Sequence, residues 1–176
     1  YQLQPDLPPR GRPAQEWMEA KFGGVANAKQ IFQRVTETGR GVGIAFDFDA
    51  MPVAPNTVLA HRALLGLADD LRAQRIAVAA LFKAYFELGL DVTDPEVVAA
   101  QVAQAIGADT AQIAALLEDD GTRIAVERDI VTAAELGISA VPTFVVDGRL
   151  AVQGAQPPSV LQALLDQARA SVPDAL

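Results

Sequence analysis

The chain has 176 residues, of which 51% are hydrophobic and 20% are charged. This composition is typical of a globular protein that buries a sizeable core, either as one domain or as a small domain with a large insertion. The net charge of −8 argues against nucleic acid and anionic membranes as partners, since no stripe of Lys and Arg side chains could neutralise phosphates. The longest apolar run, around residues 76–82, is far too short to span a bilayer.

The first third of the chain predicts one short strand and two helices. Residues 1–4 alternate before a proline, which predicts a strand that ends in a turn. Pro13 suits the first position of a helix that ends at Gly23, and a second helix is expected over residues 27–38. Residues 41–48 alternate again and predict an extended segment, followed by a loop.

A run of helices is expected next. Asn56 or Thr57 can cap the first of them by accepting a backbone N–H. Asp94 followed by Pro95 is a cap with a first-turn proline, which predicts another helix start. The helices expected after the first cover residues 75–88, 96–106, 111–117 and 123–136, with a break at Gly121 between the last two.

The C-terminal part predicts a hairpin that begins after a proline. Pro142 fits the first position of a strand, and the β-branched and aromatic residues 143–146 predict a buried strand. Asp147-Gly148 is a two-residue hairpin signal, and residues 149–152 are expected to form the return strand. The turn at 154–156 then leads into a last helix that ends near residue 171.

These features resemble the DsbA-like family of thioredoxin folds, in its FrnE or 2-hydroxychromene-2-carboxylate isomerase branch. The resemblance implies an α/β fold in which a thioredoxin-like domain, residues 1–10 and 122–176, carries a large inserted all-helical domain, residues 11–121. The motifs that carry it are Asn56-Thr57 with His61-Arg62, Ala84-Tyr85-Phe86, Val141-Pro142-Thr143-Phe144 and Gly154-Ala155-Gln156.

In the family that it resembles, the chemistry sits on Cys-x-x-Cys, or on Ser in place of the first Cys, where the first strand meets the first helix. This chain contains no cysteine and begins at Tyr1. We therefore expect the first strand, the active-site motif and the first helix to precede Tyr1, and no catalytic residue is predicted among the 176. No cofactor or metal site is expected.

The resemblance implies a thiol–disulfide oxidoreductase that acts on the thiols and disulfides of protein or peptide substrates. It also implies a cytoplasmic location, with the periplasm or secretion left open. Two alternatives stay open as well: a glutathione-dependent isomerase or kappa-like glutathione transferase, and a redox-inactive peptide-binding module. Glutathione and a second copy of the chain, as a homodimer, are left open as partners.

Six residues are expected to bind substrate. In the resembling family the peptide bond before the proline that corresponds to Pro142 is cis, and an extended peptide or glutathione pairs with the backbone of the residue before it, here Val141. The alternative is a trans proline that only opens a strand. The turn at 154–156 opens a helix whose N–H groups attract carboxylates, but Ala and Gln stand where glutathione-binding relatives have Ser and Asp. The six residues are Val141, Pro142, Ala155, Gln156, His61 and Asn56.

The remaining polar and aromatic candidates favour structural roles. His61 is the single histidine, so it cannot form a multi-histidine metal site; a hydrogen-bonded histidine on a helix face and a ligand-lining histidine both stay open. Asp47 and Asp49 are expected to be solvated rather than to bind a cation. The aromatic residues expected in the core are Trp17, Phe22, Phe82, Tyr85 and Phe86.

Overall fold

The computed structural model describes residues 2–4 and 6–170, and it divides into two compact units. The larger unit ends at Asp129 and the smaller begins at Ile130. This boundary falls inside helix α7 (Asp120–Glu135). The domain boundaries expected from the sequence, at residues 10–11 and 121–122, stay a prediction. No helix in the described ranges is long and apolar enough to cross a membrane.

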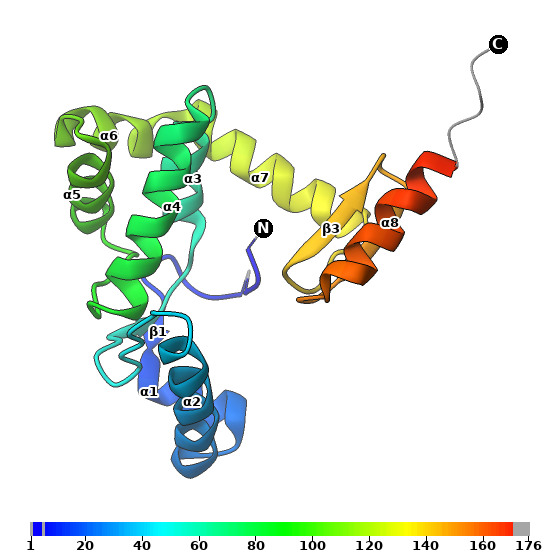
Figure 1. Ribbon diagram of the computed structural model, residues 1–176. Coiled ribbons are helices and arrows are strands. Elements are labelled where there is room, and N and C mark those ends of the chain that lie inside the picture. Colours follow the sequence, from blue (N-terminus) through cyan, green and yellow to red (C-terminus); the bar gives the residue numbers. More distant parts are fainter. Residues whose placement is uncertain (1, 5, 171–176) are drawn as a thin grey trace. The chain divides into compact units, whose positions relative to one another are not determined.

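The larger unit contains a helical hairpin made of α1 (Ala14–Phe22) and α2 (Val25–Arg40) (Figure 1). Gly23 ends α1 with φ of 74°, a left-handed conformation that glycine adopts without steric cost. Two short strands, β1 (Arg12–Pro13) and β2 (Val53–Ala54), pair antiparallel beside it. The two predicted helices are thus confirmed, with α2 longer than expected at both ends.

The two extended segments predicted in this region are wrong where the structure describes them. Residues 2–4 form no strand, and residue 1 lies outside the described residues. Residues 41–48 form turns and irregular backbone, because Phe46 and Phe48 are held by ring packing rather than by strand pairing. The ring of Phe48 stacks on Phe32 with centroids 4.4 Å apart, and Phe46 meets Phe86 edge-on. The strand instead falls at β2, in a stretch predicted to be loop.

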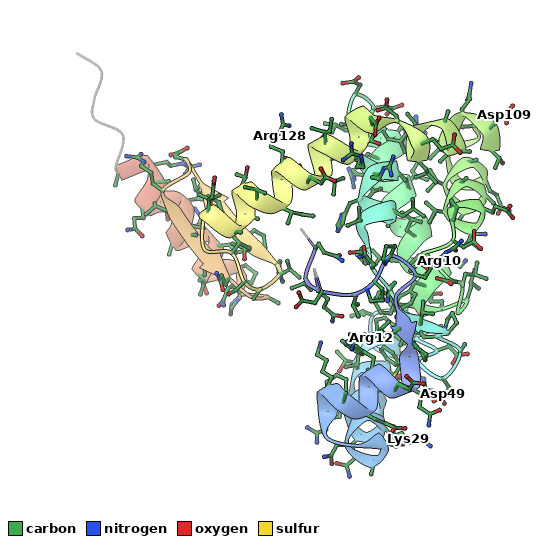
Figure 2. The ribbon with its side chains drawn as sticks, turned by 180° about the vertical axis from the view of Figure 1, so that it is seen from behind. Arg10, Arg12, Lys29, Asp49, Asp109 and Arg128 are labelled. Atoms are coloured by element: carbon green, nitrogen blue, oxygen red, sulfur yellow. The ribbon has the colours of Figure 1, made fainter. Side chains whose placement is uncertain are left out.

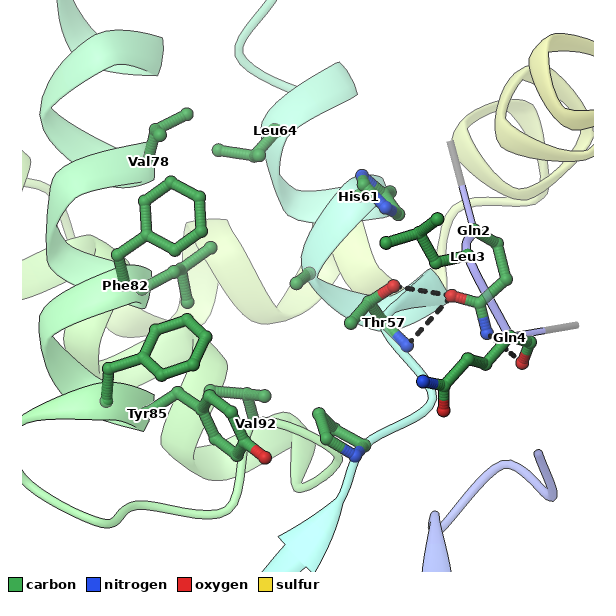
Figure 3. Close-up of a pocket in the computed structure, with 14 residues that line it drawn as sticks. Gln2, Leu3, Gln4, Thr57, His61, Leu64, Val78, Phe82, Tyr85 and Val92 are labelled. Atoms are coloured by element: carbon green, nitrogen blue, oxygen red, sulfur yellow. Dashed lines mark hydrogen bonds between the residues drawn. The ribbon is translucent and has the colours of Figure 1, made fainter. Parts of the chain in front are cut away.

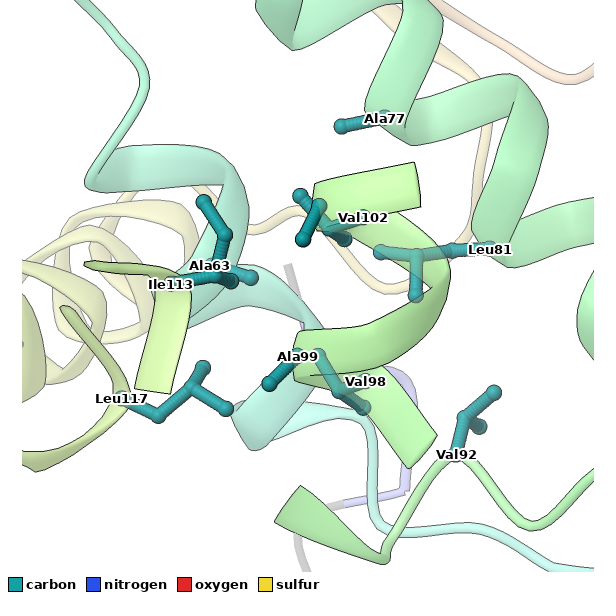
Figure 4. Packing of buried hydrophobic residues seen from close by; sticks show 10 residues of the cluster. Ala63, Ala77, Leu81, Val92, Val98, Ala99, Val102, Ile113 and Leu117 are labelled. Atoms are coloured by element: carbon teal, nitrogen blue, oxygen red, sulfur yellow. The ribbon is translucent and has the colours of Figure 1, made fainter. Parts of the chain in front are cut away.

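Four helices build the main hydrophobic core: α3 (Val58–Leu65), α4 (Leu71–Phe86), α5 (Pro95–Ile106) and α6 (Thr110–Glu118) (Figure 4). An aspartate caps three of them, since the side chains of Asp70, Asp94 and Asp109 accept backbone N–H groups of the first turn. Small residues let the helices approach closely. The buried core residues are Ala63, Ala77, Leu81, Val92, Val98, Ala99, Val102, Ala103, Ile113 and Leu117.

The break between α6 and α7 lies at Asp119, not at Gly121 as predicted. Asp119 has an extended backbone, with φ of −68° and ψ of 123°, and its carboxylate accepts the N–H of Thr122 at 2.8 Å. The carboxylate of Asp119 thus satisfies a backbone N–H in the first turn of α7 and marks the start of this helix. Gly121 lies inside the first turn of α7.

The smaller unit contains the hairpin β3 (Thr143–Val146) and β4 (Leu150–Gln153) and the helix α8 (Pro158–Ala170), shown in orange and red in Figure 1. Asp147 and Gly148 both have positive φ, as a type I′ turn requires. The register places Val146 opposite Leu150, so the loop has three residues rather than the predicted two, and β4 begins one residue later than expected.

The strand β3 is not buried, which corrects the prediction from its sequence. Phe144 is 38% exposed and Val145 is 40% exposed. Within the described residues β3 pairs with β4 alone, so one edge of this strand has no neighbouring strand. An apolar, β-branched run therefore predicted the strand correctly and its burial incorrectly, because burial depends on what covers the strand.

Candidate functional site

The loop that enters β3 is held from both sides. The Val141–Pro142 bond is cis, the isomer expected from the sequence. The carbonyl of Pro142 accepts the N–H of Gly154 at 2.7 Å, and the hydroxyl of Thr143 donates to the carbonyl of Ala140 at 2.6 Å. The loop is therefore held at Gly154, directly after β4, and at Ala140, directly before Val141.

Val141 offers an open backbone at this loop. Its residue surface is 48% exposed, and its N–H and carbonyl form no hydrogen bond with any other described residue. Strand residues alternate between the two edges, and Pro142 faces β4. The backbone groups of Thr143 and Val145 consequently face the other edge. Val141 precedes β3 across the cis bond, and its open N–H and carbonyl could pair with one residue of an extended peptide.

The turn at residues 154–156 joins the same loop through the hydrogen bond between Gly154 and Pro142. The side-chain amide of Gln156 donates to the carbonyl of Gln153 at 2.8 Å, so this nitrogen is used inside the turn. Pro157 and Pro158 follow and have no N–H. The start of α8 thus offers fewer free donors to a carboxylate than a proline-free helix would, which weakens the case for an anion site there.

Two of the six predicted substrate-binding residues, Asn56 and His61, belong to the larger unit. The other four belong to the smaller unit: Val141, Pro142, Ala155 and Gln156. The carbonyl oxygen of the Asn56 side chain accepts the N–H of Val58 at 3.1 Å, and its amide donates to the carbonyl of Leu7 at 2.8 Å. Asn56 therefore precedes the N-cap residue Thr57, accepts the first N–H of α3 and fastens the N-terminal segment to this helix. Its predicted role in substrate binding stays untested.

His61 lines a pocket of about 400 Å³ between α3, α4 and residues 2–4 (Figure 3). Leu64 and His61 come from α3, whereas Val78 and Phe82 face them from α4. The pocket is mostly apolar, and its size falls in the range of small-molecule sites. Its lining residues are Gln2, Leu3, Gln4, Pro55, Thr57, Ala60, His61, Leu64, Val78, Leu81, Phe82, Tyr85, Phe86 and Val92.

Gln2 holds the N-terminal wall of this pocket in place. Only 3% of its surface is exposed. Its side-chain oxygen accepts the N–H and the hydroxyl of Thr57, and its amide donates to the carbonyl of Gln4 at 3.1 Å. Sequence reasoning missed this residue because a glutamine in an alternating segment predicts a solvent-facing side chain, and only its distant partner Thr57 explains the burial.

Tyr85 contributes its ring to the pocket and its hydroxyl to the backbone. The hydroxyl donates to the carbonyl of Val53 at 2.8 Å. Burial, and to a lesser degree the charge of Asp91, raises the pKa of Tyr85 to about 12. Tyr85 is therefore neutral at physiological pH.

Phe82 corrects the expectation that the aromatic residues belong to the core. It is 61% exposed and lines the pocket beside Phe86. Its position on the outer face of α4 follows the helical spacing, which tells which residues share a face but not what lies opposite that face.

The acidic residues form no metal site in the described part of the chain, because no three or more His, Asp or Glu side chains there lie close enough together to hold an ion. Asp47 accepts the N–H of Ala50 at 3.1 Å and so forms a turn. The side chains of Asp49 and Lys29 are exposed (Figure 2).

Comparison with known proteins agrees with this architecture. The family model for a DSBA-like thioredoxin domain matches residues 2–166. The crystal structure of a probable DsbA oxidoreductase from Streptomyces coelicolor is similar, with a TM-score of 0.82 and 26% sequence identity over 100% of this chain and 76% of that one. No curated protein matches the chain. The predicted fold class is thereby confirmed, and the chain belongs to the DsbA-like thioredoxin-domain family, a family of the thiol–disulfide oxidoreductase type.

Proposed function

We propose that the protein carrying this chain exchanges disulfides with extended segments of protein substrates, as a FrnE-like member of its family in the cytoplasm. The observation that carries the proposal is the open backbone of Val141 in the loop that enters β3. Because none of the 176 residues is a cysteine, the reactive thiols of this proposal lie outside them. The residues present hold and orient the substrate.

The exchange needs no other reactant than the two thiol–disulfide pairs. A thiolate attacks one sulfur of the substrate disulfide, forms a mixed disulfide and releases the other sulfur as a thiolate. A second thiol of the protein then displaces the substrate, which leaves reduced while the protein pair becomes oxidised; substrate oxidation is the reverse. Pairing with Val141 would hold the attacked sulfur at a constant position along the peptide.

Disulfide exchange by the complete protein tests the activity. We expect the complete protein to reduce insulin and to reshuffle the disulfides of a scrambled protein, at a rate that depends on the cysteines of the complete protein. Two active-site cysteines without any exchange would refute the oxidoreductase proposal and favour a redox-inactive peptide-binding module.

Backbone methylation of a substrate peptide tests the role of Val141 without altering the protein. A peptide residue that pairs with Val141 turns its own N–H toward the carbonyl of Val141. We expect an N-methyl group on this residue to weaken binding about tenfold, as the loss of a satisfied backbone hydrogen bond implies, and the two neighbouring residues to tolerate the methyl group. Equal losses at all three positions would exclude this pairing.

The pocket beside His61 is the observation that favours the glutathione-dependent alternative, an isomerase or kappa-like transferase, because its volume suits a small molecule. That function predicts saturable glutathione binding by the complete protein and no exchange with peptides. Glutathione that competes with the substrate peptide, while exchange persists, would instead make glutathione a redox partner at the Val141 loop.

A further inference from the structure

We propose that Met18 and Met51 form a peroxide-responsive modification site, whose reversible oxidation loosens the hairpin of α1 and α2 from the rest of the larger unit. They are the two methionines of the chain, which has no cysteine. Although they lie far apart in the sequence, both line one pocket of about 280 Å³, which α1, α2 and residues 48–51 enclose. The proposal does not require the exchange activity proposed for the Val141 loop.

The hairpin contacts the four-helix core indirectly, through residues 46–53. In the described part of the chain, the backbones of α1 and α2 approach each other, β1 and β2, but none of the helices α3 to α6, and the hairpin lies beside these helices (Figure 1). Residues 46–53 are attached to the end of α4. The N–H of Asp47 donates to the carbonyl of Phe86 at 2.8 Å, and the hydroxyl of Tyr85 donates to the carbonyl of Val53 at the same distance. Contacts between the hairpin and residues 46–53 therefore help to decide how firmly the hairpin is held.

Apart from the backbone pairing of β1 with β2, these contacts depend on half-buried side chains around the pocket. The fully buried residues of the two hairpin helices are all small: Ala14, Ala28 and Gly39. The ring of Phe32 in α2 stacks on Phe48 with centroids 4.4 Å apart, and both rings line the pocket together with the two methionines. Thioether sulfur packs favourably against aromatic rings. The hairpin thus relies on sulfur and ring contacts where a larger buried core is lacking.

Both sulfur atoms are within reach of a small oxidant. Met18 and Met51 are only half-buried, and the pocket beside them has about 280 Å³. A cavity needs only about 15 Å³ to hold a water molecule, whereas small-molecule sites start at about 300 Å³. Hydrogen peroxide is little larger than water. The pocket therefore suits peroxide better than it suits a larger organic ligand.

The oxidation needs no reactant besides hydrogen peroxide. The methionine sulfur attacks one peroxide oxygen, so that an S–O bond forms and the O–O bond breaks. The sulfur is oxidised by two electrons and the peroxide is reduced. The second oxygen leaves as hydroxide, takes the proton of the transferred oxygen and becomes water. Methionine sulfoxide reductases reverse the change, which makes the modification a switch and not only damage.

The sulfoxide is polar, and it replaces an apolar group between the two hairpin helices and residues 48–51. Its oxygen finds no hydrogen-bond donor on the apolar side chains of the pocket, so it turns to water or to Lys29, an exposed lining residue (Figure 2). Either way the sulfur leaves its contacts with the rings. A segment with so few buried residues opens locally at a low cost in free energy. Oxidation therefore frees the hairpin while the four-helix core stays folded.

Hydrogen exchange after peroxide treatment tests the proposal. The complete protein is first treated with N-ethylmaleimide, which protects its cysteines, and then with dilute hydrogen peroxide. We expect peptide mass spectrometry to find one added oxygen on Met18 and one on Met51. Amides of α1 and α2 should then exchange at least about tenfold faster, those of α5 should be unchanged, and methionine sulfoxide reductases with dithiothreitol should restore the slow exchange. Unreactive methionines, or oxidised methionines with unchanged exchange in the hairpin, would overturn the proposal.

The matched control carries Met18→Leu and Met51→Leu together. Leucine keeps the apolar character and nearly the volume of methionine but has no sulfur to oxidise. We expect the variant to exchange like the untreated parent both before and after peroxide. The same acceleration in this variant would assign the effect to other residues and contradict the proposal.

A polar replacement tests the structural consequence without any oxidant. Met18→Gln combined with Met51→Gln places an amide where the sulfoxide would be. Amides of α1 and α2 should exchange at least about fivefold faster than in the leucine variant, because the same contacts with the rings are lost. Circular dichroism shows whether the core helices remain folded. A folded glutamine variant whose hairpin exchanges as slowly as that of the leucine variant would show that the two methionines do not hold the hairpin.

Discussion

Tyr85 connects the pocket to the folded backbone through a single hydroxyl group. Its ring lines the pocket while its hydroxyl donates to the carbonyl of Val53 in β2. Burial first, and then the charge of Asp91, disfavours the phenolate and raises the pKa of Tyr85 from 10.0 to about 12. Stability at alkaline pH is linked to this shift, because the folded protein holds the proton more tightly than the unfolded chain does.

The linkage predicts a loss of stability between pH 10 and 12 that depends on Tyr85. Below pH 10 the folded and unfolded states are both protonated at this residue, and the contribution is fully present. As the pH rises from 10 through 12, the unfolded chain loses its proton first, so unfolding becomes easier. Urea denaturation at pH 9 and at pH 11 measures this loss.

Tyr85→Phe is the control for that experiment, since other groups also titrate at high pH. The variant lacks the hydroxyl and should be less stable than the parent by about 1 kcal/mol at pH 9, the typical net value of a hydrogen bond. The difference between parent and variant should shrink by pH 11. A difference that stays constant over this range would show that the pKa of Tyr85 is not raised by folding.

Among the elements, the segment that follows α4 makes a close backbone approach at Gly89. Gly89 has φ of 61°, and a Cβ atom there would lie 2.5 Å from the carbonyl oxygen of Ala50. Gly107, the C-cap of α5, has a similar φ of 72°, but a Cβ atom at this position would meet no other atom within 4 Å. The two glycines thus share the backbone conformation and differ in the space around it.

Alanine at the two positions separates backbone strain from steric conflict. Gly107→Ala should cost about 1 to 2 kcal/mol, the usual penalty of a left-handed conformation for a residue with Cβ. Gly89→Ala should cost about 1 to 3 kcal/mol more, because overpacking adds to the same strain. Chemical denaturation measures both. Equal costs would mean that the segment around Ala50 moves aside easily.

For the molecule as a whole, stability depends on the core of the larger unit (Figure 4). Ile113 is 2% exposed and lies among the buried residues of α3 to α6. Ile113→Ala should lower the free energy of unfolding by about 2 to 5 kcal/mol, and Ile113→Val by about 0.5 to 1.5 kcal/mol. Since single domains are stable by only about 5 to 15 kcal/mol, the alanine variant should show a clearly lower melting temperature. Equal melting temperatures for the parent and the alanine variant would contradict the assignment of Ile113 to the core.

The family, the helices and the hairpin could be predicted from the sequence. Helix starts at Asp94 and the end of α1 at Gly23 were predictable because capping is local: an acceptor or a left-handed glycine meets backbone groups within the same turn. The Asp147-Gly148 turn was predictable for the same reason. The motifs around Asn56, Val141 and Gly154 indicated the family, which the match over residues 2–166 confirms.

Only the tertiary structure decided which residues are buried and which line a pocket. Gln2 is buried by a partner 55 residues away, and Phe82 remains exposed although its neighbours on α4 enter the core. The exposure of β3 likewise depends on its missing neighbour within the described residues, not on its own apolar side chains. Burial is a property of surfaces brought together from distant parts of the chain, so local periodicity can predict a helix face or a strand but not what covers it.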